Sequence, residues 1–182
     1  MKKMLFYGLL CLIGAVAGLF LYEGAIFHRY LAHQHGTDMN IPVNERAPVR
    51  AQGQITIAAP ADTVWQVLAR IDDWPGWQSD VTEAHLIGEL TEGAEFRWKA
   101  GGLSFRSRIH TLRSATELGW TGTTIGASAI HNWFFQEENG QTIVRVEESL
   151  QGVFPRLFRK YFQHNLEAGI QQNLADLKRA AE

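Results

Sequence analysis

The sequence predicts an α+β protein in which a curved antiparallel sheet wraps around a long C-terminal helix, preceded by an N-terminal transmembrane helix. Three features lead to this prediction: an apolar run near the N-terminus, a repeated strand-and-turn pattern, and a long amphipathic segment at the C-terminus. Of the 182 residues, 46% are hydrophobic and 20% are charged, as expected for a folded domain. The net charge of −2 provides no basic field, so we expect no nucleic-acid partner.

The N-terminal run from Met4 to Tyr22 is uncharged and follows Lys2 and Lys3. As a helix this run is about 28 Å long, close to the hydrocarbon thickness of a bilayer. Lysines before the run favour a cytoplasmic N-terminus. We therefore expect residues 1–22 to be a single-pass anchor in the cytoplasmic membrane, with the domain on the extracytoplasmic side. A signal peptide is the alternative, because Ala15–Ala17 fits a small-x-small cleavage site.

Residues 23–49 are predicted to be an irregular tether, because prolines and asparagines interrupt any regular pattern there. His28, His33 and His35 lie in this stretch, without a cysteine or a carboxylate–histidine repeat that would indicate a metal site. We expect no metal and no cofactor. The folded domain is predicted over residues 50–182.

The domain is predicted to begin with a strand in QGQITIAAP and a helix that opens at Pro60. The next stretch, WPGWQSDV, carries Trp74 and Trp77 on either side of a Pro-Gly step, which forbids a continuous helix. Two tryptophans in a turn-forming segment either close one end of the core or line a space that binds a ligand.

Two hairpins are predicted between residues 81 and 152. Gly101-Gly102 forms a two-residue turn that pairs Trp98 with Phe105 on an apolar face. Asn139-Gly140 forms a second turn, predicted to be of type I′, which pairs Phe135 with Val144 and Trp133 with Val146.

The same register places His131 opposite Glu148 on this apolar face, with Cβ atoms about 5 Å apart. A buried charge without a partner is unfavourable, so the two side chains should form a hydrogen bond. The pair either fixes the strand register, contacts a polar group of a ligand, or transfers a proton. Ser149 faces the other side of the sheet, which argues against a Ser–His–acid triad.

The C-terminal segment from Phe154 onward has apolar residues at helical spacing, and Pro155 suits its first turn. This helix should lie across the apolar face of the sheet. Arg156, Arg159 and Lys160 form a basic cluster near its start, which is either solvated or in contact with anionic lipid headgroups.

The order of these elements is the helix-grip arrangement, and the sequence resembles the SRPBCC superfamily (START, Bet v 1, polyketide cyclase/dehydrase). The likeness covers about residues 50–181 and is carried by ITIAAPADTVWQVLARIDDWPGW, GAEFRWKAGG, LGWTG, AIHNWFF and TIVRVEESLQG. The pattern is fairly specific for the fold and weak for activity, because the superfamily has no single catalytic motif. Its members include carriers of lipids, sterols and quinones, aromatase/cyclases, and subunits of larger complexes.

The resemblance implies a cavity between the sheet and the long helix, with Trp74 and Trp77 at its rim. The predicted ligand-binding residues are Trp74, Trp77, Trp98, Phe105, Trp120, His131, Trp133, Phe135, Glu148, Phe162, Leu166 and Ile170. The alternative is an ordinary packed core.

Three functions follow. The first is a membrane-anchored carrier or binding protein for a hydrophobic small molecule, such as a lipid, a quinone or a polyketide-like compound. The second is a cyclase or dehydratase that uses His131 and Glu148. The third is an accessory subunit of a membrane protein complex.

Overall fold

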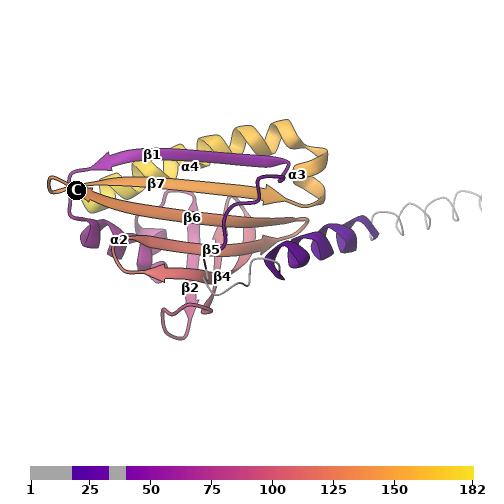
Figure 1. Cartoon of the computed structure of the whole chain (residues 1–182), viewed down its shortest axis with the longest axis horizontal. Coiled ribbons are helices and arrows are strands. Elements are labelled where there is room, and N and C mark those ends of the chain that lie inside the picture. The colour runs from indigo at the N-terminus through magenta and orange to yellow at the C-terminus, as the bar shows by residue number, and fades with distance from the viewer. Residues whose placement is uncertain (1–17, 33–39) are drawn as a thin grey trace, which may run out of the picture.

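The computed structural model describes residues 18–32 and 40–182 (Figure 1). From residue 49 onward, one seven-stranded antiparallel sheet is combined with short helices and one long helix, so the α+β prediction is confirmed. The elements are β1 (Val49–Ile57), α2 (Ala61–Ala69), η1 (Ile71–Gly76), β2 (Val81–Ile87), β3 (Glu95–Ala100), β4 (Leu103–Arg113), β5 (Glu117–Thr124), β6 (Ala127–Glu138), β7 (Gln141–Gln151), α3 (Val153–Leu157) and α4 (Arg159–Ala181). The strand order is β1-β7-β6-β5-β4-β3-β2.

Both predicted hairpins are present in the predicted register. Gly101 and Gly102 have φ angles of 54° and 77°, and Asn139 and Gly140 have 54° and 75°. Two consecutive positive φ angles characterise a type I′ turn, whose twist matches that of the flanking strands. Trp98 therefore pairs with Phe105, and His131 pairs with Glu148.

Helix α4 covers one face of the sheet, which we call the inner face. The helix approaches the sheet closely at Gly53 of β1, where an added Cβ atom would lie 2.7 Å from Ile170 and 2.8 Å from Leu174. A side chain at this position would force these two neighbours to shift, so glycine suits the close approach. In Figure 1, α4 lies behind the sheet and runs from the end near α3 toward the C-terminus.

The predicted single C-terminal helix is divided in two. Phe158, with φ −116° and ψ 42°, leaves the helical conformation and separates α3 from α4. The break lets α3 pack against the turn between β5 and β6, where Phe154 lies so close to Gly126 that an added Cβ atom would be 2.5 Å from its ring. Helical periodicity continues through the break, so the sequence alone did not reveal it.

The predicted irregular tether is corrected. Residues 18–32 are helical, and Glu23 and Phe27 are buried with 5% and 4% of their surface exposed. Residues 40–48 then cross the face of the sheet opposite α4, which we call the outer face (Figure 1). The polar and proline-rich composition suggested a free spacer, but these residues bury Ile41 and Asn44 against the domain.

Within residues 18–32 and 40–182, no helix is both long and apolar enough to cross a membrane. The predicted anchor, Met4–Tyr22, lies outside the described residues except for positions 18–22. His33 and His35 also lie outside them.

Candidate functional site

A cavity of about 250 Å³ lies between the inner face of the sheet and α4. Trp120, His131 and Ile170 form its buried floor, with 5%, 7% and 2% of their surface exposed. Leu103, which is 43% exposed, lies at its mouth near the turn between β3 and β4. Eight of the twelve predicted site residues line this cavity: Trp98, Phe105, Trp120, His131, Glu148, Phe162, Leu166 and Ile170.

The other four predicted residues, Trp74, Trp77, Trp133 and Phe135, do not line it. Trp74 and Trp133 are each 1% exposed, and Phe135 is 5% exposed, so all three are packed in the core. Trp77 is partly buried against the same core. The prediction that these side chains face the cavity is therefore wrong.

Of the two alternatives for the tryptophans beside the Pro-Gly step, Trp74 takes the first and packs in the core. Pro75 lies within the 3₁₀ helix η1, which turns Trp74 inward rather than toward the surface. Its indole Nε1 donates a hydrogen bond of 2.8 Å to the carbonyl oxygen of Leu68. Its ring packs at 5.8 Å from Trp98 and 5.5 Å from Trp120, measured between centroids. Trp74 thus supports two walls of the cavity from behind.

His131 and Glu148, which face each other in the β6–β7 register, form the predicted polar pair in the cavity. His131 Nδ1 lies 3.0 Å from Glu148 Oε2, and the side chains are only 9% and 13% exposed. With the carboxylate as acceptor, the ring donates through Nδ1. His131 Nε2 is buried and has no hydrogen-bond partner within the described chain. In this tautomer Nε2 is an acceptor that a donor group of a ligand can use.

Two tryptophans hold the imidazole of His131 in place. Its ring centroid lies 4.5 Å from that of Trp120 and 5.5 Å from that of Trp133, with interplanar angles of 28° and 9°. Near-parallel contact with two large rings restricts rotation of the side chain. The orientation of Nε2 is therefore fixed by packing before any ligand binds.

Sequence reasoning missed the polar residues that α4 contributes. Asn165, Gly169 and Asn173 line the cavity and are spaced four residues apart on the helix. Asn173 Oδ1 is buried without a hydrogen-bond partner in the described residues. The sequence could have predicted them, because residues four apart share a helix face. Their stripe runs beside the apolar stripe of Phe162, Leu166 and Ile170, which was predicted to line the cavity.

Asp80 is a further cavity residue that the sequence did not indicate. The residue is exposed at the surface, but the surrounding protein removes part of the hydration of its carboxyl group. This desolvation raises its pKa above the ordinary 3.8, a hydrogen bond from its own backbone opposes the shift, and the charges of Asp176 and Glu148 add to it. Asp80 therefore adds an acidic group to the lining of the cavity.

No cluster of three or more metal-ligating side chains occurs in the part of the chain that the structure describes. The polar groups of the cavity are instead suited to hydrogen bonding. His131 and Asn173, which line this otherwise aromatic and aliphatic cavity, each carry one buried acceptor atom without a hydrogen-bond partner in the described residues. A lining of this composition is suited to an apolar molecule that is oriented by a few polar contacts.

The sequence profile of the family described as polyketide cyclase/dehydrase and lipid transport matches residues 48–182. A search of curated protein sequences gave no match.

Solved structures with the same fold include three that illustrate its range. A hypothetical protein, jhp0584, from Helicobacter pylori has a TM-score of 0.69 at 15% identity, over 81% of this chain and 99% of that one. The Zhui aromatase/cyclase from Streptomyces sp. R1128 has a TM-score of 0.66 at 17% identity, over 72% of this chain and 92% of that one. A START superfamily protein from Mycobacterium smegmatis has a TM-score of 0.60 at 11% identity, over 72% of this chain and 96% of that one. At these identities the likeness establishes the fold alone.

Proposed function

The chain belongs to the polyketide cyclase/dehydrase and lipid-transport family, and from this premise we propose that its cavity binds a hydrophobic small molecule that carries one polar group. The observation that supports this most is the buried Nε2 of His131, which has no partner in the described chain and belongs to an aromatic cavity floor. A buried polar atom without a hydrogen bond costs about 1–3 kcal/mol, and a ligand hydroxyl would remove this cost.

The size of the cavity limits the ligand. Its volume of about 250 Å³ is slightly below the roughly 300–1,000 Å³ of sites that enclose drug-sized molecules. A small ring system, or the ring end of a longer amphiphile whose tail leaves past Leu103, fits this space. The ring end of a quinone, a sterol-like head or a cyclised polyketide belongs to this class.

Catalysis is a second candidate, favoured by one specific arrangement. His131 combines a fixed orientation, a carboxylate partner and a free acceptor nitrogen, as a general base requires. Asp80 lines the same cavity, and desolvation raises the pKa of its carboxyl group above the ordinary value. Proton removal by His131, with the carboxyl group of Asp80 in the same cavity, would suit a cyclisation or dehydration.

We further propose that residues 4–22 anchor the chain in the cytoplasmic membrane, with the domain on the extracytoplasmic side. This proposal rests on the bilayer-length apolar run after Lys2 and Lys3. Intact mass of the native protein tests it: the anchor requires residues 4–22 to be present, whereas a mature chain that begins near Gly18 contradicts it.

Native mass spectrometry and solvent extraction of the full chain, purified in mild detergent, test the binding function. We expect a stoichiometric apolar compound, or saturable binding of a naphthalene fluorophore by protein in lipid nanodiscs after subtraction of empty nanodiscs. Phe162→Ala should weaken binding, since Phe162 lines the cavity. Phe134→Ala is the matched control, because its ring lies on the outer face under Arg145.

The outcomes separate the three functions. Saturable binding without turnover supports the carrier, and conversion of a cyclisable polyketide chain that is lost in His131→Ala supports the enzyme. Absence of both a bound compound and fluorophore binding contradicts the binding proposal and leaves the accessory subunit as the remaining reading.

A further inference from the structure

Exposed large hydrophobic side chains gather at one end of the molecule. In the described residues eight such side chains are exposed, and seven of them lie in or beside the helix 18–32, the hairpin turns and the start of α4. The eighth, Ile87, is at the end of β2. We call the five that lie in the domain itself the apolar end: Leu103, Ile125, Leu157, Phe158 and Tyr161.

Several contacts show that these segments are neighbours. Gly126 lies beneath the rings of Phe154 and Phe20, which contact each other edge to face at 5.7 Å. Thr124 Oγ1 donates a hydrogen bond to the carbonyl oxygen of Ser104, which brings the tips of the two hairpins together. In Figure 1, α3, the turn between β5 and β6, and the helix 18–32 meet at the same end of the sheet.

Ile125 is the least expected member of the apolar end. It occupies the tip of a tight turn and is 72% exposed, where polar residues or glycine are usual. Leu157, Phe158 and Tyr161 are 62%, 56% and 65% exposed at the junction of α3 and α4. A cluster of exposed apolar side chains at one end of a domain is typical of a surface that contacts a protein or a membrane.

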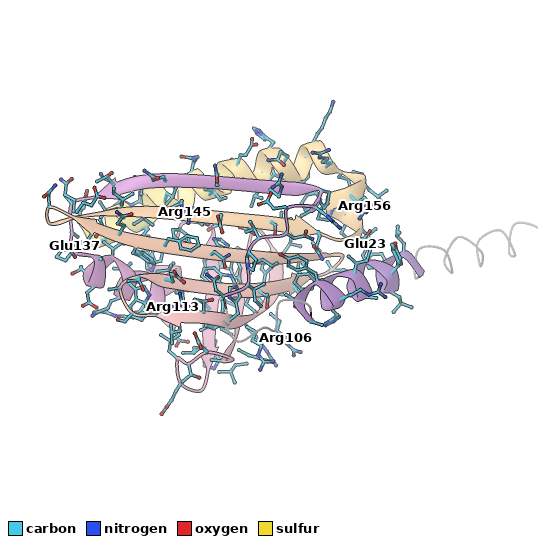
Figure 2. The ribbon with its side chains drawn as sticks, viewed as in Figure 1. Glu23, Arg106, Arg113, Glu137, Arg145 and Arg156 are labelled. Atoms are coloured by element: carbon cyan, nitrogen blue, oxygen red, sulfur yellow. The ribbon has the colours of Figure 1, made fainter. Side chains whose placement is uncertain are left out.

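The position of the helix 18–32 favours a membrane over a protein as the partner of the apolar end. The predicted membrane span ends at Tyr22, and the next residue, Glu23, is buried and accepts a hydrogen bond of 2.6 Å from Arg156 Nε. Figure 2 shows Glu23 and Arg156 side by side at this end of the molecule. No free spacer therefore separates the predicted span from the domain, and with that span in a bilayer the domain end that holds Arg156 would lie at the bilayer surface.

Charge at the start of α4 agrees with an anionic lipid surface. Arg159 and Lys160 are exposed and directly follow the apolar junction at Phe158. Apolar side chains inserted among headgroups, with cations beside them, are the usual composition of an interfacial membrane contact.

We propose that the apolar end of the domain rests in the headgroup region of an anionic bilayer, so that the cavity mouth opens toward the lipid. Leu103 belongs both to the apolar end and to the mouth, and Phe162, which contacts Tyr161 at 5.6 Å, lines the cavity. A hydrophobic ligand then passes between bilayer and cavity without crossing bulk water. The inference rests on the proposed membrane anchor.

Depth-dependent fluorescence quenching tests this orientation. The full chain carries Cys11→Ser, which removes its one cysteine, and a single new cysteine at Ile125 or Leu157 labelled with an environment-sensitive fluorophore. The protein is reconstituted in vesicles of phosphatidylcholine and phosphatidylglycerol that contain nitroxide-labelled lipid. Gln141→Cys is the matched control, since Gln141 is exposed beside the turn at the other end of the β6–β7 hairpin.

We expect strong quenching at positions 125 and 157 and little at position 141. Arg159→Gln should reduce the ratio of docked to undocked domain about fivefold, because one cation near an anionic surface contributes about 1 kcal/mol. Arg70→Gln, a charge removed after α2, should leave the quenching unchanged. Quenching at 125 and 157 that equals that at 141 overturns the proposal, and an Arg159→Gln variant identical to its control overturns its electrostatic part.

Flotation of the vesicles is measured on the same samples. If the protein floats but positions 125 and 157 are not quenched, the orientation is wrong while the anchor stands. Failure to float overturns both.

Discussion

The two faces of the sheet carry polar residues on the same two strands but use them differently. On the outer face, Asn132 Nδ2 donates to the carbonyl oxygen of Ile41, and Ser149 Oγ accepts from the backbone nitrogen of Asn44. On the inner face, the preceding residues of each strand, His131 and Glu148, bond only to each other in the described chain. The outer face is covered by the chain's own residues 40–48, whereas the inner face leaves a cavity.

This difference indicates which polar groups have a structural role. Each outer contact fixes the N-terminal segment on the domain, so those side chains are committed to folding. The inner pair fixes nothing beyond its own two strands and keeps the acceptor at His131 Nε2 available. Buried polar atoms without a partner also occur on the outer face, at Asn132 Oδ1 and Gln151 Nε2, so the difference between the faces lies in the cavity that His131 lines.

The largest loss of stability should come from the core beside the cavity on the inner face. Trp133→Ala removes a side chain that is 1% exposed and should lower the free energy of unfolding by about 3–5 kcal/mol. Phe162→Ala, at the half-buried cavity wall, should cost only about 1 kcal/mol because the ring already borders empty space. Urea unfolding of the full chain in detergent, followed by circular dichroism, measures both.

Ligand binding should reverse this ranking. Phe162→Ala should weaken fluorophore binding more than Trp133→Ala does. Stronger binding by Trp133→Ala than by the wild type would show that this side chain only fills space behind the cavity, which agrees with its position.

The outer face should respond with an intermediate loss of stability. The Asn44 side chain donates 2.5 Å to Gln151 Oε1, and Gln151 is 5% exposed. Asn44→Ala leaves that buried acceptor unpaired and should destabilise the domain by about 1–3 kcal/mol. Fluorophore affinity should not change. A loss of affinity equal to that of Phe162→Ala would mean that the two faces are not independent.

The smallest effect should be the pH dependence of Asp80. Its pKa is raised in the folded protein, so the native state binds more protons than the unfolded chain above pH 3.8, and stability falls as the pH rises through this window. Asp80→Asn removes this unfavourable contribution at neutral pH and should have no effect below pH 3.8. The gain should stay within about 0.5 kcal/mol, because the residue is exposed. Urea midpoints of both proteins at pH 3.5 and pH 7 measure it, and a larger gain at the lower pH contradicts the assignment.

The sequence predicted the inner face well because the information there is local. Asn139-Gly140 dictates a turn, the turn dictates the register, and the period of two places His131 and Glu148 on the α4 side. The eight cavity residues that were placed correctly lie on regular strands or on the helix, where periodicity determines direction.

The sequence predicted the outer face poorly because its contacts are long-range. Asn44 and Ser149 are 105 residues apart in the sequence. No periodicity in residues 40–48 indicates that this segment lies on the sheet. Trp74 and Trp77 were misplaced for a related reason: a 3₁₀ helix with Pro75 inside it has no pattern from which the direction of a side chain can be read. The break at Phe158 is likewise set by how α3 packs, not by the spacing of apolar residues.

The measurement that tests the central claim most directly is a double-mutant cycle on the inner pair. Fluorophore affinity is measured in lipid nanodiscs for the full chain, His131→Ala, Glu148→Gln and the double variant, with Asn132→Ala as the control on the outer face. If the pair acts together on a ligand, the double variant should lose less affinity than the two single losses added, with a coupling of about 0.5–3 kcal/mol, while Asn132→Ala binds normally. A coupling near zero in affinity, with coupling present only in stability, would contradict a binding role and assign His131 and Glu148 to the fold alone.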